Sequence, residues 1–493
     1  MPATLSTGDT AAVPQAAPAP VSRLLARAAT FVAVAAAVVF AAVSGQGYAS
    51  GSRLLLALPL IAAVAVALGV LALTRFSVFV MVMLTIRASL DLARLSGKAA
   101  GNVATNSAAV KGLDPTSLFA VLFLLAAVMW LAAQYRRQNG LPGSRLRLAL
   151  VVFFLTGLVS VFGASNHQAS ALEALRILAV VVMFVVLEQM MVDRPTMNRL
   201  LAAIFASAAF PVAFTLLGVL TGTARSEAKG GFTRLTGTFA QANDFGRYLM
   251  VIIIFGVAVY PYVAPRLRRW LAVLLAGCVV CMMLTLTITA MIGTVVGLVI
   301  VGLVQSKRLL GGVVLACLCA LLFVPQLLNR VTGATDISTI QSVGGNSNSS
   351  LAWRLSYWTD VLPLANANPV TGIGLNMTQY ETDAAKQPHN DFLRAYVETG
   401  LLGFGAYVAL IIAMLGLGRR AVQTSYAGTL DRGVAAGFWG VATAFALVSV
   451  AANVISNVAL LWYVFAFGAA AAAVVRRQRE QERALMPARV PAE

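Results

Sequence analysis

A histidine late in the chain is the residue best suited to acid–base chemistry. His389 lies in the polar segment Lys386-Gln-Pro-His-Asn-Asp391, directly before a helix that we expect to start near Phe392. Histidine can exchange a proton near neutral pH. Carboxylates close in sequence could orient its ring, namely Asp383, Asp391 and Glu398. Taken alone, a loop histidine is more often an incidental surface residue, and His167 in Ser165-Asn-His-Gln168 fits that reading.

Four arginines suggest a site for an anionic group. Arg234 lies in a glycine-rich polar segment, Arg354 in Trp353-Arg-Leu-Ser-Tyr-Trp358, and Arg176 and Arg247 in or at the ends of apolar runs. Ionisable groups at membrane depth are costly and usually functional. The planar guanidinium binds phosphate in bidentate fashion, so these residues would suit a lipid headgroup such as a diphosphate. The alternatives are snorkelling, a structural ion pair or, for Arg354, a charge on the rim of an amphipathic helix.

Other common chemical motifs carry little weight here. Cys278 and Cys281 form a C-x-x-C, but the stretch is apolar and better explained as packing. Gly372-Ile-Gly374 has no preceding strand and no following Lys-Ser/Thr, so it indicates a turn and no nucleotide site. A metal site is conceivable from Glu381, Asp383, His389 and Asp391. We predict no metal ion and no cofactor.

The composition identifies a membrane protein. Of 493 residues, 59% are hydrophobic and only 11% charged, and the mean hydropathy is +0.84. A soluble chain has about 25% charged residues. The net charge of +18 would suggest nucleic acid in a soluble protein. Here it reflects the accumulation of Lys and Arg in cytoplasmic loops, and we expect no nucleic-acid partner.

Apolar runs predict an all-α polytopic protein with about 12–14 transmembrane helices, since a spanning helix needs about 20 apolar residues. With 14 helices and both termini inside, all six basic clusters fall in the cytoplasm, and the long polar segments fall outside. The third run carries Arg87 and is short. The predicted centres are Val38, Val64, Val82, Leu124, Phe154, Val182, Ala209, Ile253, Leu275, Leu298, Leu315, Ile411, Phe445 and Phe467.

The same reading divides the chain into five segments. Within the third of them, aromatic and leucine residues at helical spacing, Trp353 to Leu364, predict an amphipathic helix against the outer membrane face. The segments are a disordered cytoplasmic tail (1–22), helices 1–11 (23–326), a large extracytoplasmic catalytic loop (327–398), helices 12–14 (399–475) and a basic cytoplasmic tail (476–493).

Three motifs follow one another along the chain. The first is Arg234-x-x-Gly-x-Phe-x-x-x-Asn243, which leads into a helix. The second is Arg354-x-x-x-Trp358, followed by Asn368-Pro-Val-Thr-Gly-Ile-Gly374. The third is Pro388-His-Asn390-x-Phe-Leu, followed by Glu398-Thr-Gly-Leu-Leu-Gly403. In this order they resemble the O-antigen ligase and O-antigen polymerase superfamily of bacterial envelope glycosyltransferases. Each motif is weak alone, and together they are fairly specific for the superfamily.

The resemblance implies a GT-C type membrane glycosyltransferase in the bacterial cytoplasmic (inner) membrane. The donor would be a glycan on an undecaprenyl diphosphate carrier, and the acceptor an envelope lipid, polymer or protein. Transfer would occur on the extracytoplasmic face without a metal ion. His389 would act on the acceptor hydroxyl, while Arg234 and Arg354 would hold the diphosphate and stabilise leaving-group charge. Further substrate contacts would come from Asn243, Arg247, Arg176, Trp358, Asn390 and Glu398.

The chain differs from the family pattern at one place, and the sequence leaves alternative functions open. Many members carry a Ser-Arg pair where this chain has Thr287-Ile-Thr-Ala290, so Arg247 or Arg176 would have to replace that arginine. The motifs separate neither ligation from polymerisation nor one sugar or acceptor from another. A secondary transporter would instead show broken helices and charges at the membrane midplane.

Overall fold

The computed structural model describes residues 53–92, 115–138, 140–141, 143–229, 232–323 and 350–485, together with Gln46. The chain divides into two compact units, residues 1–75 and 76–493. The described helix of the first unit is α2 (Arg53–Thr74). The predicted tail at 1–22 and the predicted helix centre Val38 lie outside the described residues.

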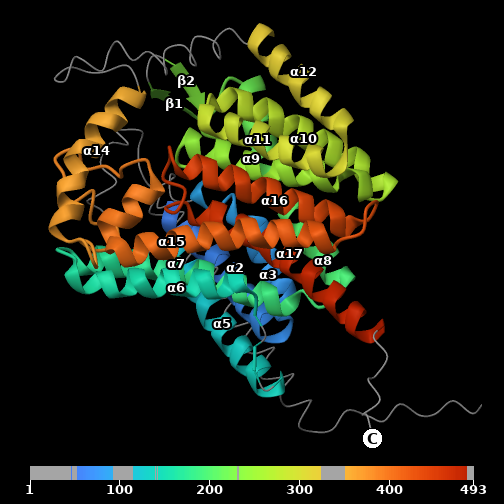
Figure 1. The fold of residues 1–493 in the computed structure, drawn as a ribbon, viewed down its shortest axis with the longest axis horizontal. Helices are drawn as coiled ribbons and strands as arrows, with labels where there is room; N and C mark the ends of the chain where they lie inside the picture. Colours follow the sequence, from blue (N-terminus) through green and yellow to red (C-terminus); the bar gives the residue numbers. More distant parts are fainter. Residues whose placement is uncertain are drawn as a thin grey trace, which may run out of the picture. The chain divides into compact units, whose positions relative to one another are not determined.

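The second unit consists mainly of helices, most of them long and apolar (Figure 1). Among the described residues, ten helices are long and apolar enough to cross a membrane. The predicted all-α polytopic class is therefore confirmed, and every predicted centre except Val38 falls within a described helix. The helices are α3 (Phe76–Arg87), α5 (Pro115–Gln138), α6 (Arg145–Ser160), α7 (His167–Met190), α8 (Arg194–Leu220), α9 (Ala242–Val259), α10 (Pro265–Thr285), α11 (Ile288–Gln305), α12 (Lys307–Phe323), α14 (Ser350–Ala367), α15 (Asp391–Thr424), α16 (Leu430–Ser449) and α17 (Val458–Leu485), with short 3-10 turns η1 (Val161–Gly163) and η2 (Tyr260–Tyr262).

Short polar side chains begin several of these helices. The side chains of Ser144, Asp193 and Thr429 accept a hydrogen bond from the backbone three residues further on. Such N-caps satisfy amide groups that have no partner within the helix. Asn390 caps α15 in the same way, through Phe392 N and Leu393 N, and this cap fixes the residue that follows His389.

Small residues allow the central helices to pack closely. Where α11 crosses α16, a Cβ added to Gly440 would lie 2.6 Å from the carbonyl oxygen of Gly297. Small residues at helix crossings let backbones approach within a membrane. Between α9 and α17, the rings of Phe255 and Phe467 stack with centroids 3.6 Å apart. This packing fixes α9, α16 and α17, whose ends form part of the site.

Basic residues gather at one end of the second unit. Asp431, at the start of α16, binds Arg194 of α8 and Arg477 of α17, each at 2.9 Å. Arg476 donates to the carbonyl oxygens of Glu188 and Met191 at the end of α7. Because α7, α16 and α17 all run from this end to the other, their remaining ends meet at the opposite end, here called the site end.

Two polar segments at the site end have regular structure. The segment between α8 and α9 forms an antiparallel hairpin of β1 (Ser226–Lys229) and β2 (Phe232–Leu235), which the hydropathy pattern did not predict. A helix, α14, is present where the aromatic and leucine spacing predicted one. The helix α15 begins at Asp391, inside the segment predicted as loop 327–398, and its helical geometry is interrupted at Gly400.

Candidate active site

Arg234 is buried on β2 and bonded entirely within the protein. Its Nε donates to the carbonyl oxygen of Thr285 at 2.9 Å, and its Nη2 donates to Asn243 Oδ1 at 2.6 Å and Thr287 Oγ1 at 3.0 Å. Across the hairpin, Nη1 pairs with Glu227 at 3.3 Å. Arg234 is 2% exposed, whereas the Glu227 side chain is 25% exposed. The arginine thus joins the hairpin, α9 and the turn between α10 and α11.

That turn is the place where the family pattern departs. Leu286, between Thr285 and Thr287, adopts a left-handed conformation with φ of 47°. This region is uncommon for a residue with a side chain. Ala290 is fully buried on the first turn of α11. The guanidinium that reaches this turn is that of Arg234, which arrives from the hairpin.

The helix α14 holds the segment that leads to His389. Tyr357 contacts the Thr382 hydroxyl at 2.7 Å and donates to the carbonyl oxygen of Lys386 at 2.5 Å. Trp358 Nε1 donates to the carbonyl oxygen of Pro388 at 2.6 Å. Burial raises the pKa of Tyr357 above its usual value, so its hydroxyl stays protonated and can donate. Through these bonds, Tyr357 and Trp358 of α14 hold the segment that leads to His389.

His389 itself is held from two sides. Its φ is 53°, a left-handed conformation that surrounding contacts must enforce in a residue with a side chain. The Trp353 ring meets the imidazole edge-on with centroids 5.7 Å apart. On another side, the Asn453 amide nitrogen lies 3.2 Å from His389 Nδ1. The sequence analysis did not consider Asn453, which lies in the loop between α16 and α17.

Asp391 ties this loop to the histidine segment. Its carboxylate accepts hydrogen bonds from the backbone amides of Val454 (2.9 and 3.0 Å) and Ile455 (3.3 and 3.4 Å). Tyr407 lies 3.5 Å from the same carboxylate. Sequence proximity suggested that Asp391 would orient His389 directly. The structure instead shows it binding the loop that carries Asn453.

Arg247 lies beneath the loop and completes this cluster. It is 4% exposed on α9, one turn after Asn243. Its Nη1 donates to Asp244 at 3.4 Å and to the carbonyl oxygen of Asn453 at 3.2 Å. Its Nε is buried and has no hydrogen-bond partner among the described residues. A buried donor without a partner is costly, so a polar group of a substrate would be favoured there.

A buried ion network links two further candidates. Arg394 of α15 binds Glu398 at 2.9 Å and Glu173 of α7 at 3.2 Å. Glu173 also pairs with Arg176 at 3.0 Å. Glu398 accepts from Asn376 N at 2.8 Å and from the Thr378 hydroxyl at 2.9 Å. Glu398 is therefore bound within the fold, whereas the Arg176 side chain is 44% exposed.

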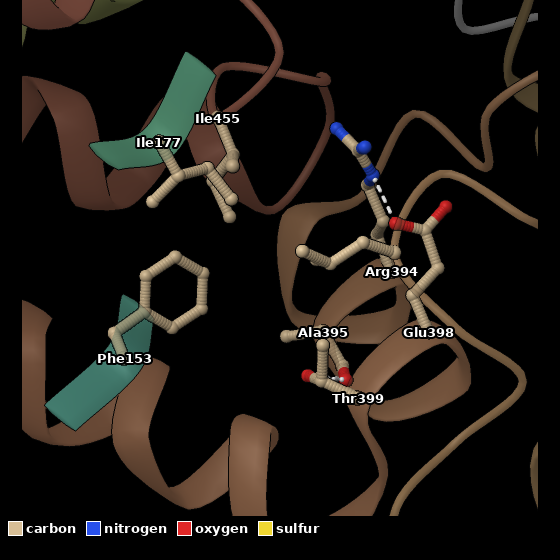
Figure 2. Close-up of a pocket in the computed structure, with 8 residues that line it drawn as sticks. Phe153, Ile177, Arg394, Ala395, Glu398, Thr399 and Ile455 are labelled. Atoms are coloured by element: carbon tan, nitrogen blue, oxygen red, sulfur yellow. Dashed lines mark hydrogen bonds and ion pairs between the residues drawn. The ribbon is translucent and has the colours of Figure 1, made fainter. Parts of the chain in front are cut away.

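Figure 2 shows the small pocket beside this network. Phe153, Ile177 and Ile455 form an apolar wall, and the Arg394–Glu398 ion pair forms a polar one. The pocket therefore offers an apolar surface and a charged surface together, next to the helix that begins just after His389.

The turn after α14 docks onto the break in α15. Ile373 N and Gly374 N donate to the carbonyl oxygens of Val397 and Glu398, both at 3.0 Å. Gly400 has φ of 66° and ψ of −167°, and a Cβ there would lie 2.1 Å from the carbonyl oxygen of Val370. The predicted turn at Gly372–Gly374 therefore fixes the start of the His389 segment.

The structure thus connects most of the predicted residues through α9, α14 and α15. His389 reaches Arg247 through Asn453, and Arg247 and Arg234 meet α9 on successive turns. Trp358 and Asn390 hold the segment on either side of His389, through Pro388 and the start of α15. Arg354 lies on α14 beside Trp353 and is partly buried.

The residues that the sequence analysis missed are polar groups in apolar surroundings. The three that matter most are Glu173, Arg394 and Asn453. Glu173 precedes Arg176 by three positions, and Arg394 precedes Glu398 by four, spacings that pair side chains on a helix. This spacing was a usable signal, whereas nothing in the sequence pointed Asn453 toward His389.

No group of three or more His, Cys, Asp or Glu residues in the described part of the chain could hold a metal ion. The carboxylates proposed near His389 point elsewhere: Glu381 accepts a hydrogen bond from Ser165, and Asp391 binds the α16–α17 loop. Cys278 and Cys281 are buried free thiols in α10.

Residues 270–408 match a family model described as O-Antigen ligase. The chain carries an O-antigen ligase domain. The matched range runs from α10 into α15 and contains α14 and His389, while Arg234, Arg247 and Asn453 lie outside it. No curated protein matches the chain. The expected superfamily is thus confirmed, and the family supports a glycosyltransferase of the ligase or polymerase type in a multi-pass membrane protein.

Proposed function

We propose that this protein transfers a glycan from an undecaprenyl diphosphate carrier to an envelope acceptor on the outer face of the bacterial cytoplasmic membrane. The acceptor would be a lipid, a wall polymer or a protein. The observation that supports this most is the path of contacts from Arg247 through Asn453 to His389. It brings a buried cation with an unsatisfied donor close to a histidine, as a diphosphate leaving group and an acceptor hydroxyl require.

The charge distribution supports an outer-face site. Basic residues of α8 and α17 meet at the end opposite the site, and basic residues accumulate on the cytoplasmic side of membrane proteins. Further basic residues lie at the start of α10 (Arg266, Arg268 and Arg269) and near the end of α15 (Arg419 and Arg420). These helix ends lie away from His389 and Arg234.

In the proposed reaction, the acceptor hydroxyl attacks the anomeric carbon and the diphosphate leaves. His389 positions or deprotonates the hydroxyl. The leaving diphosphate gains negative charge, and cations fixed in advance at that point lower the barrier. Arg247 and Arg354 serve this role. Arg234 contributes through Nη1, because the Glu227 side chain paired with it is 25% exposed and a phosphate can displace it. No metal ion takes part in the proposal.

The test is deletion in the host with complementation by wild type, His389→Ala or the control His167→Ala. His167 is exposed at the start of α7, so its loss should leave transfer intact. Membrane abundance must be equal before glycans are compared. Long glycans retained on the lipid carrier in His389→Ala indicate ligation, which we favour, and accumulated single repeat units indicate polymerisation. Unchanged envelope glycans would contradict both and return attention to transport.

A further inference from the structure

The loop between α16 and α17 is fixed at four consecutive residues. Asn453 O accepts from Arg247 at 3.2 Å, and the amides of Val454 and Ile455 donate to Asp391. The Ser456 hydroxyl accepts from Arg394 Nη1. Every anchoring side chain comes from α9 or α15, which also carry proposed site residues. The loop is therefore held rigidly against the histidine segment.

The anchored loop holds the Asn453 side chain against His389. The amide group of Asn453 lies at 3.2 Å from His389 Nδ1, and its Oδ1 is buried without a partner among the described residues. His389 and Asp391 lie two residues apart and bind neighbouring residues of the same loop, Asn453 for His389 and Val454 and Ile455 for Asp391. A displacement of the loop by even an ångström would therefore move Asn453 relative to the imidazole.

A contact to one ring nitrogen decides where a neutral histidine carries its proton. With the amide nitrogen donating to Nδ1, the proton of the neutral ring resides on Nε2. The Trp353 ring packs against the imidazole at a steep angle and so restricts its rotation. Partners that orient metal-ligating histidines contribute about 10–100-fold to metal affinity or activity, and we expect an effect of the same order for this metal-free contact.

We propose that Asn453 is the positioning residue of His389: it holds the imidazole through Nδ1, so that Nε2–H meets the acceptor hydroxyl as a hydrogen-bond donor, which is the positioning role and not the base role of the proposed function. The role of His389 in transfer rests on the proposed function, whereas the contact itself does not. Asn453 does not touch the reacting atoms. It acts through the orientation and tautomer of the ring.

The chain offers a direct spectroscopic test because it has only two histidines. In a His167→Gln background, ¹⁵N-histidine labelling of the full-length protein in nanodiscs reports His389 alone. We expect a single dominant tautomer with Nδ1 as acceptor. Asn453→Ala should give a mixture of tautomers, and Asn453→Asp, whose carboxylate can only accept, should move the proton to Nδ1. Identical imidazole spectra in all three proteins would overturn the proposal.

Activity provides the second readout. Asn453→Ala should lower kcat by about 10–100-fold with little change in the KM of the donor, since the change affects a reacting group and not donor binding. The matched control is Asn198→Ala, an exposed asparagine on α8 near the basic end. Equal membrane abundance and elution volume exclude misfolding, and the near-isosteric Asn453→Asp keeps the shape of the loop. An unchanged kcat in Asn453→Ala would overturn the proposal. If His389→Ala itself retains transfer, the proposed function fails, and the spectra still decide the contact.

Discussion

Arg394 and Glu173 form an ion pair at 3.2 Å that joins α15 to α7 across 221 residues of sequence. Both side chains are nearly inaccessible, at 3% and 5% exposure. Arg394 also holds Glu398, whose carboxylate fixes the segment before His389 through Asn376 and Thr378. One buried arginine thus connects the helix bundle to the segment that carries the proposed catalytic histidine.

Removing that arginine should destabilise the protein. Arg394→Ala leaves two buried carboxylates without their shared cation, and breaking a buried pair from one side costs about 3–5 kcal/mol. We expect reduced membrane abundance and a clearly lower thermal unfolding temperature in detergent. Arg176→Ala is the control, because its side chain is 44% exposed and such pairs contribute about 0–1 kcal/mol. Equal unfolding temperatures for the two variants would show that the network is not structural.

Arg234→Lys should lose most transfer activity although it keeps the positive charge. The guanidinium bonds Thr285, Asn243 and Thr287 at once and pairs with Glu227, a fork-shaped arrangement that an ammonium group cannot reproduce. We expect loss of most transfer activity together with faster hydrogen exchange in the β1–β2 hairpin. Arg199→Lys, an exposed position on α8, should have no effect on either. Full activity in Arg234→Lys would mean that only its charge matters.

A single methyl group at Gly400 should prevent correct folding. Its φ and ψ belong to a region that glycine alone occupies readily, and a Cβ would lie 2.1 Å from Val370 O. Gly400→Ala should therefore cost about 1–3 kcal/mol in backbone strain, and the overlap with Val370 O adds to that cost. Gly405→Ala, on the same helix with nothing within 4 Å of the added Cβ, should instead be neutral or stabilise by about 0.5–1 kcal/mol. Comparable expression and unfolding temperature of the two variants would contradict the described break in α15.

The Tyr357 hydroxyl should make the His389 segment sensitive to alkaline pH. Burial raises the pKa of Tyr357, so the folded state favours the protonated hydroxyl. The stability that it contributes is complete below the pKa of a free tyrosine, about 10, and is lost as pH rises through the higher folded value. At neutral pH, Tyr357→Phe should lower the free energy of local opening of residues 382–389 by about 1 kcal/mol.

Hydrogen exchange of residues 382–389 measures this effect at neutral pH. Above pH 10, tryptophan fluorescence follows it, because Trp353 stacks on Tyr357 with centroids 5.1 Å apart. The wild type should show an alkaline transition that Tyr357→Phe lacks. The same alkaline transition in both proteins would assign it to another group.

The sequence alone determined which segments become helices in the membrane and which residue types could serve transfer. Hydropathy located the described helices, and the basic clusters predicted a common side, because run length and charge are local properties. The aromatic spacing from Trp353 to Leu364 likewise located α14.

Only the tertiary structure decided which of these residues meet. It paired Arg234 with Glu227 and the α10–α11 turn, gave Asp391 a backbone partner in place of His389, and brought Asn453 to the imidazole. These partners come from helices far apart in sequence, and the packing of α9, α15, α16 and α17 sets their distances. The hydropathy of an apolar helix in lipid does not depend on the neighbour that it packs against. Its sequence therefore does not reveal the polar contacts made at its ends.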